Sequence, residues 1–257
     1  MSQSLVHAYV IGQTPRPDLT TDLQRRFPDS AFQIVGALDG MRSEEVVQAN
    51  LEHVHRALDG YPLETRLRDG TRVVVDAAFV EGRLQVALEG PDVTAVADPA
   101  IGEPVREPDA HLILCAGPFP GLVEPTTTSG GGSALIRPFD VAVTTFRARG
   151  FHRLDVLVPF RDQAAPAAAK WTSAGFVCRT RILSERPRDL TLSEWASEWV
   201  EHGDAAALVF DYVGFPSEEL SRVSARVQLP VFDLGHLALD ALDDFLGARD
   251  RMPNEDR

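Results

Sequence analysis

Short apolar runs and segments with helical spacing alternate along the second half of the chain, and this alternation constrains the fold more than any other feature. The segments with helical spacing are residues 164–175, 192–202, 217–228 and 237–246. The apolar runs that alternate with them are residues 154–158, 176–183, 206–210 and 231–232. A strand, a helix and a further strand form a right-handed crossover that makes the two strands parallel. The pattern predicts an α/β fold with helices on both faces of a parallel sheet.

The first half of the chain repeats this count of strands. Its apolar runs lie at residues 5–11, 32–38, 111–115 and 134–138, with helices expected at 19–27, 43–58 and 77–88. Residues 63–75 alternate around Arg68-Asp69-Gly70, which indicates a hairpin. We therefore expect two pseudo-symmetric lobes, each a four-stranded parallel sheet flanked by helices. The N-terminal lobe would comprise residues 1–135 and 236–257, with an insertion at 61–110, and the C-terminal lobe residues 136–235.

Composition excludes several classes of protein. The chain has 38 Asp and Glu residues against 25 Lys and Arg residues, and its formal net charge of −13 disfavours a nucleic-acid partner. No apolar run is long enough to span a membrane, and the first residues lack the pattern of a secretory signal, so we expect a cytoplasmic protein without a membrane partner. The two cysteines should be reduced thiols, and the six histidines other than His236 show no ligand spacing, so we expect no metal site.

Candidate site residues follow the ends of the predicted strands. In sheets of this type ligands bind outside the carboxyl ends of the strands, and a two-lobed protein would hold its ligand between two such edges. Gln13 and Thr14 could hydrogen-bond a carboxylate there, and the guanidinium of Arg16 could bind it with two parallel bonds. The other candidates at strand ends are Cys115, Ala116, Gly117, Arg161, Asp211, Tyr212 and Gly214.

These candidates have different expected roles. Cys115 could be a nucleophile or a proton donor, or a small buried apolar residue without a catalytic role. If it acts as a thiolate, its pKa should be depressed and it should react quickly at neutral pH. Gly117 and Gly214 could direct backbone N–H groups toward an oxyanion. Asp211 could orient Tyr212, act as a base, or cap the helix that begins near Ser217.

Four blocks of the chain resemble the signature segments of the AroM family. They are Ile11–Asp18, Thr65–Thr71, Leu114–Gly121 and Asp211–Phe215, in this order along nearly the whole sequence. This family is similar in fold to the aspartate/glutamate racemase superfamily, which includes maleate isomerases and arylmalonate decarboxylases. The resemblance implies two lobes that hold a small carboxylate between them, a cysteine on one or both sides, and no cofactor.

The sequence departs from the racemase pattern at one position. Two-base racemisation needs a thiol on each face of the substrate, but the position that corresponds to Cys115 in the second lobe is Tyr212. A phenol titrates at higher pH than a thiol, so Tyr212 would be a poor partner in reversible proton exchange. One-sided chemistry is favoured: decarboxylation with protonation, isomerisation, or covalent addition of Cys115 to the substrate.

The leading hypothesis is thus a cofactor-independent enzyme, of the isomerase, racemase or decarboxylase type, that acts on a small carboxylate through Cys115 in the cleft between the lobes. The alternative from another class is a non-catalytic protein that binds a small carboxylate or has a regulatory role on the same fold. A scaffold that uses the acidic segment at 90–110 as a partner site is a third hypothesis. The substrate is left open, and so is the oligomeric state, for which a homodimer is one option.

Overall fold

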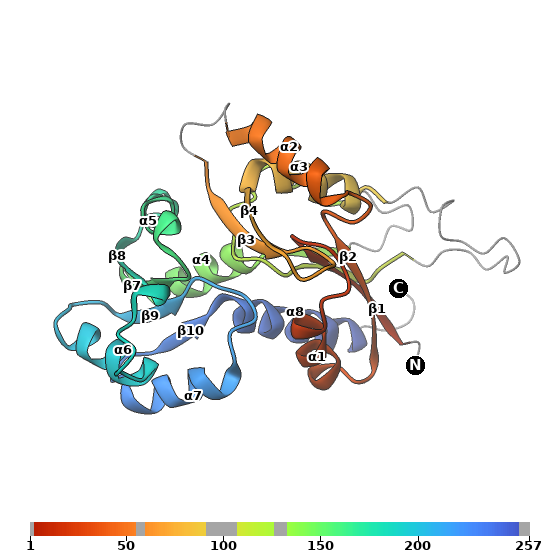
Figure 1. Cartoon of the computed structure of the whole chain (residues 1–257). Coiled ribbons are helices and arrows are strands. Elements are labelled where there is room, and N and C mark those ends of the chain that lie inside the picture. Colours follow the sequence, from red (N-terminus) through yellow and green to blue (C-terminus); the bar gives the residue numbers. More distant parts are fainter. Residues whose placement is uncertain (1–2, 55–59, 91–106, 126–132, 252–257) are drawn as a thin grey trace, which may run out of the picture.

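Two parallel sheets of four strands each form the core of the molecule, which confirms the predicted fold class (Figure 1). The computed structural model describes residues 3–54, 60–90, 107–125 and 133–251. The chain runs through the first sheet and then the second, and its last helix returns to the first sheet. Within these residues no helix is both long enough and apolar enough to cross a bilayer.

The first sheet has the strand order β2-β1-β5-β6. All three pairings are parallel, and Val6 at the centre of the sheet lies between Phe32 and Ala110. The short apolar strand β5 is completely buried, as expected of a strand with helices on both faces. The strands are β1 (Ser4–Val10), β2 (Ser30–Gly36), β5 (Ala110–Ile113) and β6 (Ala134–Ile136).

The second sheet repeats this topology. Its order is β10-β9-β7-β8, so its first strand in sequence again pairs with the second and the third, and the fourth lies at the edge beside the third. The two lobes are therefore pseudo-symmetric, as the sequence predicts. The strands are β7 (Arg153–Val158), β8 (Val177–Ile182), β9 (Ala207–Phe210) and β10 (Val231–Asp233).

Helices cover both faces of each sheet. On the first sheet, α2 and α3 pack on one face and α1 and α8 on the other. On the second sheet, α4 and α5 pack on one face and α6 and α7 on the other. The helices are α1 (Pro17–Arg26), α2 (Ser43–Val54), α3 (Ala77–Leu88), α4 (Pro138–Ala148), α5 (Ala164–Ser173), α6 (Leu192–Glu201), α7 (Ser217–Arg226) and α8 (Leu234–Asp250).

An antiparallel hairpin is inserted between α2 and α3. Its strands are β3 (Pro62–Arg66) and β4 (Arg72–Asp76), and its turn includes Gly70 with a φ of 87°. The predicted hairpin at residues 63–75 is confirmed. Leu63 and Leu67 join the core under α3, and Leu63, Glu64 and Thr65 of β3 also border the space between the lobes.

Helix α4 is the element that the sequence reasoning missed. Residues 134–138 were expected to form a strand, but Pro138 occupies the first turn of a helix, where a proline is well tolerated. The buried Ala142 and Phe146 of α4 pack against the second sheet. Helix α8 contributes to both cores, with Leu237 in the second lobe and Leu242 in the first.

Two predictions concern segments that lie largely outside the described residues. They are the acidic surface segment at 90–110, of which residues 91–106 are not described, and the loop at 124–133, of which residues 126–132 are not described. The lobe boundaries at 135 and 236 stay a prediction.

Candidate functional site

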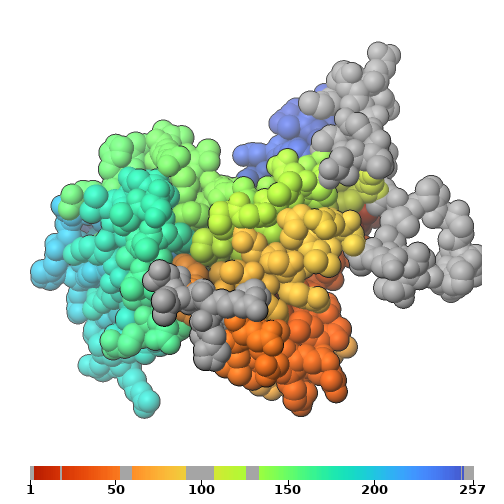
Figure 2. All heavy atoms as spheres, turned by 90° about the horizontal axis from the view of Figure 1, so that it is seen from above, coloured from red at the N-terminus to blue at the C-terminus, as the bar shows by residue number. Residues whose placement is uncertain are grey.

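A cavity of about 70 Å³ lies at the carboxyl ends of the strands, between the two lobes and beside the hairpin. Figure 2 shows the second lobe in green to blue beside the first-lobe residues in orange and yellow. The cavity is lined by residues that follow β1, β5, β7 and β9, together with residues of β3. Among the predicted site residues, it brings together Arg16, Cys115, Ala116, Gly117, Asp211 and Tyr212.

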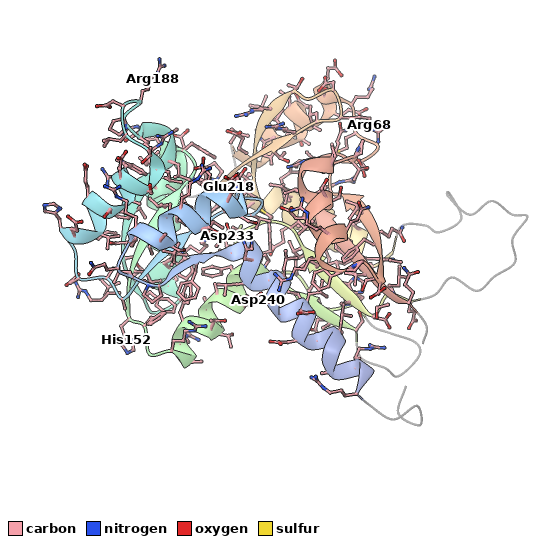
Figure 3. The ribbon with its side chains drawn as sticks, turned by 90° about the horizontal axis from the view of Figure 1, so that it is seen from below. Arg68, His152, Arg188, Glu218, Asp233 and Asp240 are labelled. Atoms are coloured by element: carbon pink, nitrogen blue, oxygen red, sulfur yellow. The ribbon has the colours of Figure 1, made fainter. Side chains whose placement is uncertain are left out.

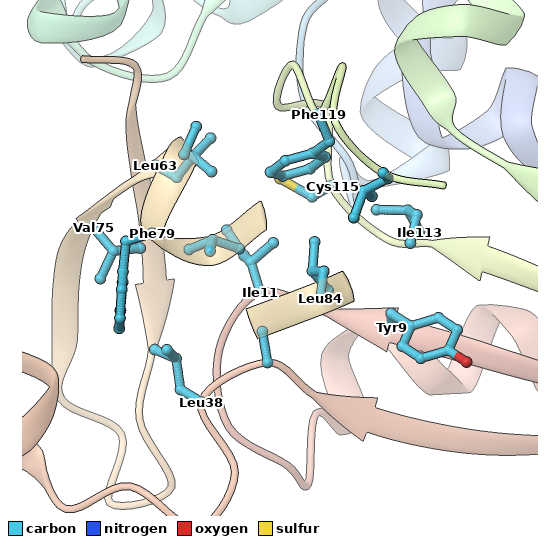
Figure 4. Packing of buried hydrophobic residues seen from close by; sticks show 14 of the residues in the cluster. Tyr9, Ile11, Leu38, Leu63, Val75, Phe79, Leu84, Ile113, Cys115 and Phe119 are labelled. Carbon is cyan, nitrogen blue, oxygen red and sulfur yellow. The ribbon is translucent and has the colours of Figure 1, made fainter. Parts of the chain in front are cut away.

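Cys115 lies just beyond the end of β5, at the border between the cavity and the first core. Only 7% of the residue is exposed, and Figure 4 shows it among the apolar side chains of this core. The Gly117 N–H donates a hydrogen bond to its Sγ at 3.3 Å. Burial raises the pKa of the thiol to about 12, against the opposing effects of that hydrogen bond and of the charges of Lys170 and Arg16. The thiol is therefore protonated at neutral pH, contrary to the depressed pKa expected of a resting thiolate.

Tyr212 occupies the position in the second lobe that matches Cys115 in the first. After β5, the Leu114 N–H donates to the carbonyl of Tyr9 on the neighbouring strand β1 at 2.8 Å. After β9, the Asp211 N–H donates to the carbonyl of Leu157 on the neighbouring strand β7 at 2.9 Å. The next residue in each lobe lines the cavity, and Tyr212 is 40% exposed there. The geometry thus places one thiol and one phenol at equivalent strand ends.

Asp211 has both carboxylate oxygens engaged in a buried network. Its Oδ1 accepts a hydrogen bond from Lys170 Nζ at 2.7 Å, and its Oδ2 accepts one from the indole N–H of Trp171 at 3.0 Å. The expectation that Asp211 caps the helix near Ser217 is wrong, because Pro216 is the residue at that helix start. The paired carboxylate is also poorly placed to act as a base.

Lys170 is the residue of this network that sequence reasoning missed. Its side chain is 3% exposed, and its Nζ also donates to the Ala116 carbonyl of the first lobe at 2.9 Å. The rings of Tyr61 and Phe139 lie 5.2 and 4.6 Å from the ammonium. Burial lowers the pKa of Lys170 and the Asp211 charge opposes that shift. A lysine is normally solvated, so the signals in the sequence are that Lys170 is the only lysine of the chain and that it lies within an alanine-rich segment.

Gln13 and Thr14 build the loop after β1 and are not among the residues that line the cavity. The Gln13 amide donates to the carbonyls of Leu38 and Met41, and its Oε1 accepts from the Arg68 N–H. Both the N–H and the hydroxyl of Thr14 donate to the Asp39 carboxylate at 2.8 Å. These hydrogen bonds hold the loop after β1 in place. The same loop carries Arg16, the third residue of the predicted group, which does line the cavity.

Arg161 and Gly214 lie outside this cavity. The guanidinium of Arg161 forms an ion pair with Glu185 at 2.5 Å. Gly214 has a φ of 86° and lines a smaller neighbouring cavity. Both residues still follow strands of the second sheet, as predicted, but neither contributes to the space beside Cys115.

Four further polar residues line the cavity and were not among the predicted site residues, namely Tyr61, Glu64, Thr65 and Gln163. Thr65 Oγ1 and Gln163 Oε1 are buried, and neither atom has a hydrogen-bond partner among the described residues. Gln163 Nε2 donates to the Pro62 carbonyl at 2.8 Å, which joins the second lobe to the hairpin. The hydroxyl-bearing Tyr61 lines the cavity beside them. Across the described ranges, no three His, Cys, Asp or Glu side chains gather as a metal site would require.

Comparison with known proteins identifies the family. The model described as AroM protein matches residues 6–239, which is nearly the whole chain. The chain belongs to the AroM family. A search of curated protein sequences finds no match.

Solved structures show where the AroM fold belongs. Arylmalonate decarboxylase is 15% identical over 93% of this chain and 91% of that chain, with a TM-score of 0.53. A variant of the maleate isomerase Iso from Pseudomonas putida S16, with maleate, is 14% identical over 96% and 93% of the chains, with a TM-score of 0.52. Glutamate racemase from Francisella tularensis is 8% identical over 99% and 85%, with a TM-score of 0.50. These neighbours share the fold of the aspartate/glutamate racemase superfamily, as the resemblance implied.

Proposed function

We propose that this AroM protein is an enzyme that acts on a small carboxylate, with the Cys115 thiol delivering a proton to one face of the substrate. The observation that carries the proposal is the pairing of Cys115 and Tyr212 at equivalent strand ends, where both line one cavity. Enzyme sites in α/β proteins lie at such edges. The small volume of the cavity limits the substrate to a small molecule.

The protonation state of the thiol supports proton donation over nucleophilic attack. Because burial holds the pKa of Cys115 near 12, the thiol keeps its proton at neutral pH and is a weak nucleophile. A carbanion beside a carboxylate is a much stronger base and can take that proton. The thiolate that remains is stabilised by the Gly117 N–H and by the charges of Lys170 and Arg16. Water then returns the proton to sulfur.

Decarboxylation of a substituted malonate fits this arrangement. The bond from the α-carbon to one carboxylate breaks, carbon dioxide leaves, and the electron pair that stays on carbon takes the Cys115 proton. This step uses no cofactor. Racemisation would require Tyr212 to donate and accept a proton on the second face of the substrate near neutral pH. A phenol is poorly suited to this because it ordinarily titrates at much higher pH. Isomerisation by a single proton donor is the second reaction that the site allows.

Arg16 and Thr65 are the groups that we assign to the substrate carboxylate. Arg16 brings a positive charge to the cavity wall, and the buried Thr65 hydroxyl is available to donate a hydrogen bond. Gln163 Oε1 can accept a hydrogen bond from a hydroxyl or amide of the substrate. The neighbours named arylmalonate decarboxylase, maleate isomerase and glutamate racemase support a small carboxylate as the substrate class.

The experiment is turnover in deuterated water with a panel of 2-substituted malonates, maleate and both enantiomers of glutamate, followed by NMR. We expect a malonate to lose carbon dioxide and to gain one deuteron in a single configuration. Cys115→Ser should lower kcat by roughly 10²–10⁴ and still bind the substrate in a thermal-shift assay. Cys178→Ser, which removes the other thiol, should have the kcat of the wild type. Full activity of Cys115→Ser would show that sulfur is not the donor.

Thr65→Val tests the carboxylate subsite. The hydroxyl has no partner in the described structure, so its removal should leave the unfolding free energy unchanged or slightly higher. Loss of a hydrogen bond to a charged carboxylate should nevertheless raise KM by about 10-fold. Unchanged KM together with a lower Tm would indicate a purely structural role for Thr65.

A non-catalytic carboxylate-binding protein is the second candidate function. The observations that favour it are the fully protonated thiol and the complete engagement of the Asp211 carboxylate by Lys170 and Trp171. The same panel separates the two functions. A binding protein would show a thermal shift with a carboxylate but no turnover, and its Cys115→Ser variant would bind equally well.

A further inference from the structure

Ser217, His236 and Asp233 form a hydrogen-bonded relay that the Cys115 site does not use. The Ser217 Oγ lies 3.0 Å from His236 Nε2, and His236 Nδ1 lies 3.0 Å from Asp233 Oδ1. Ser217 begins α7, Asp233 ends β10, and His236 lies in the first turn of α8. Figure 3 labels Asp233 at the start of α8 and Glu218 in the adjacent first turn of α7. Three residues from two helix starts thus meet in one line of polar contacts.

A second cavity adjoins the relay. It has a volume of about 40 Å³, and both Asp233 and His236 line it. Asp233 is 3% exposed, whereas 39% of the His236 side chain is exposed and Ser217 is exposed. Small solutes can therefore reach the hydroxyl and the ring while the carboxylate is held in the interior. The walls are mainly apolar and include Leu19, Leu23, Phe215 and Leu239.

Helix capping explains only part of this arrangement. Asp233 caps α8, because its Oδ1 accepts a hydrogen bond from the His236 N–H at 2.9 Å. The cap accounts for the proximity of the carboxylate and the His236 backbone. The cap does not require the Ser217 hydroxyl to lie beside Nε2 of the His236 ring. It also leaves Asp233 Oδ2 buried with no hydrogen-bond partner among the described residues, in the wall of the cavity.

The charges around His236 favour its role as a base. The hydrogen bond to Asp233 raises the pKa of His236, and burial opposes that shift. The Asp240 charge on α8 also favours the imidazolium, whereas Arg26 on α1 disfavours it and is itself paired with Asp240. Asp22 of α1 lines the same cavity, and Ser217 of α7 is the neutral neighbour. An imidazolium formed by removal of the Ser217 proton is thus stabilised by the carboxylate that orients it.

From this geometry we infer that Ser217 is a nucleophile toward short-chain carboxylic esters, with His236 as the general base and Asp233 as the residue that orients it. Ser217 Oγ bonds to the acyl carbon while His236 Nε2 takes its proton. The bond to the leaving alcohol then breaks, and the alcohol oxygen takes that proton from His236. Water attacks the acyl-serine in the second half, gives its proton to His236, and Ser217 leaves with the proton returned.

The surroundings define the class of ester. The first-turn N–H groups of α7 have no partner within the helix and lie beside Ser217, where they can bind an oxyanion. His236 lines the small apolar cavity and Ser217 lies at the ring of His236 outside its lining, so only a short apolar acyl group on Ser217 could extend into it. Glu218 and Glu219 lie in the same turn and disfavour an anionic ester. We therefore assign neutral esters of short acids to this site.

The experiment labels the full-length protein with a fluorophosphonate, a reagent for activated serines, and locates the adduct by peptide mass spectrometry. We expect one adduct, on Ser217, and none in Ser217→Ala. His236→Gln should lower the labelling rate by at least about 10²-fold. Ser221→Ala is the matched control, since Ser221 is exposed one turn further along α7 and its hydroxyl donates to the Ser217 carbonyl at 2.9 Å. It should be labelled at the wild-type rate.

Hydrolysis of p-nitrophenyl acetate supplies the second measurement. The rate of the wild type minus that of Ser217→Ala should be positive and should rise with pH as His236 loses its proton. Because Ser217 is exposed, its substitution should leave Tm unchanged. If His236→Gln does not fold, the comparison of the wild type with Ser217→Ala is therefore sufficient to test the inference. Equal labelling or equal hydrolysis by the wild type and Ser217→Ala would overturn the inference and leave the relay a link between α7 and α8.

Discussion

Cys115 has a protonated thiol within reach of groups that stabilise its thiolate. Burial is the largest influence on the pKa of the thiol and keeps the proton on sulfur. The Gly117 N–H and the charges of Lys170 and Arg16 lower this pKa, but by less. A substrate that fills the cavity would bring a negative charge of its own, which again favours the protonated form. The residue is thus suited to release its proton only to a strong base formed during the reaction.

The alkylation rate of Cys115 should report this environment directly. In a Cys178→Ser background, reaction with iodoacetamide should be slow at pH 7 and should rise continuously through pH 9–11, because the thiolate fraction grows until the pH reaches the pKa of about 12. The urea-unfolded protein serves as the control and should titrate near the ordinary pKa of cysteine. Fast labelling of the native protein at pH 7 would contradict the structure.

Lys170 is the residue whose loss should be most damaging to stability. Lys170→Met keeps an unbranched apolar stem but leaves the buried Asp211 carboxylate without its counter-charge, which should cost about 3–5 kcal/mol of unfolding free energy. Urea denaturation measures this difference. The double variant Lys170→Met, Asp211→Asn should recover part of the loss, since no unpaired charge remains. A loss below about 1 kcal/mol for the single variant would show that the pair is solvated.

Single residues also show where sequence reasoning stops. The carboxyl ends of strands could be located from apolar runs, and this placed Arg16, Cys115 and Tyr212 at one cavity. The direction of each side chain could not be read in the same way. Gln13 also follows the end of a strand, but its side-chain amide donates hydrogen bonds to the carbonyls of Leu38 and Met41. Such pairings depend on residues distant in sequence that no local pattern reveals.

The contact between the loop after β1 and strand β3 is the element-scale feature that shapes the site. Gly12 approaches the hairpin so closely that an added Cβ would lie 2.4 Å from both Arg66 O and Thr65 Oγ1. The Gln13 N–H donates to Arg66 O at 3.1 Å in the same place. The absence of a side chain at residue 12 lets the hairpin form one wall of the cavity.

Gly12→Ala should therefore separate these two elements. We expect a loss of about 1–3 kcal/mol of unfolding free energy and a weaker affinity for the substrate, since Thr65 and Arg16 would both be displaced. Gly82→Ala is the matched control, because Gly82 lies on the exposed side of α3 with no atom within 4 Å of the new Cβ. It should stabilise the protein by about 1 kcal/mol. Equal effects of the two substitutions would contradict the close contact.

Elements differ in how far the sequence predicts them. Strands and helices with strong periodicity were located correctly, and so was the hairpin with Gly70 in its turn. The apolar run at 134–138 predicts a strand that ends at Pro138, whereas Pro138 begins helix α4. A proline is equally compatible with the first turn of a helix, so local chemistry alone leaves both options open. Packing of Phe146 against the second sheet decides between them.

The two lobes are joined by contacts that make independent unfolding unfavourable. Lys170 of the second lobe bonds to the Ala116 carbonyl, and Gln163 bonds to the Pro62 carbonyl of the hairpin. Ala116 itself packs in the core of the second lobe. The pseudo-symmetric topology was evident from the count of strands, whereas these links between lobes were not, because they rest on tertiary contacts.

Unfolding should accordingly be one cooperative transition. All three tryptophans, Trp171, Trp195 and Trp199, lie in the second lobe, so their fluorescence reports that lobe, whereas far-ultraviolet circular dichroism reports both. We expect the two midpoints in urea to coincide for the wild type. A fluorescence midpoint that differs from the dichroism midpoint would show that the lobes unfold separately.

Helix α8 carries a consequence for how the chain is made. Its residues Ala238, Leu242 and Leu246 complete the core beneath a sheet whose strands all come from residues 4–136. A ribosome synthesises these strands long before the helix that covers them. Until then α1 alone covers that face of the sheet, so the core of the amino-terminal half stays incomplete until the end of the chain has been made.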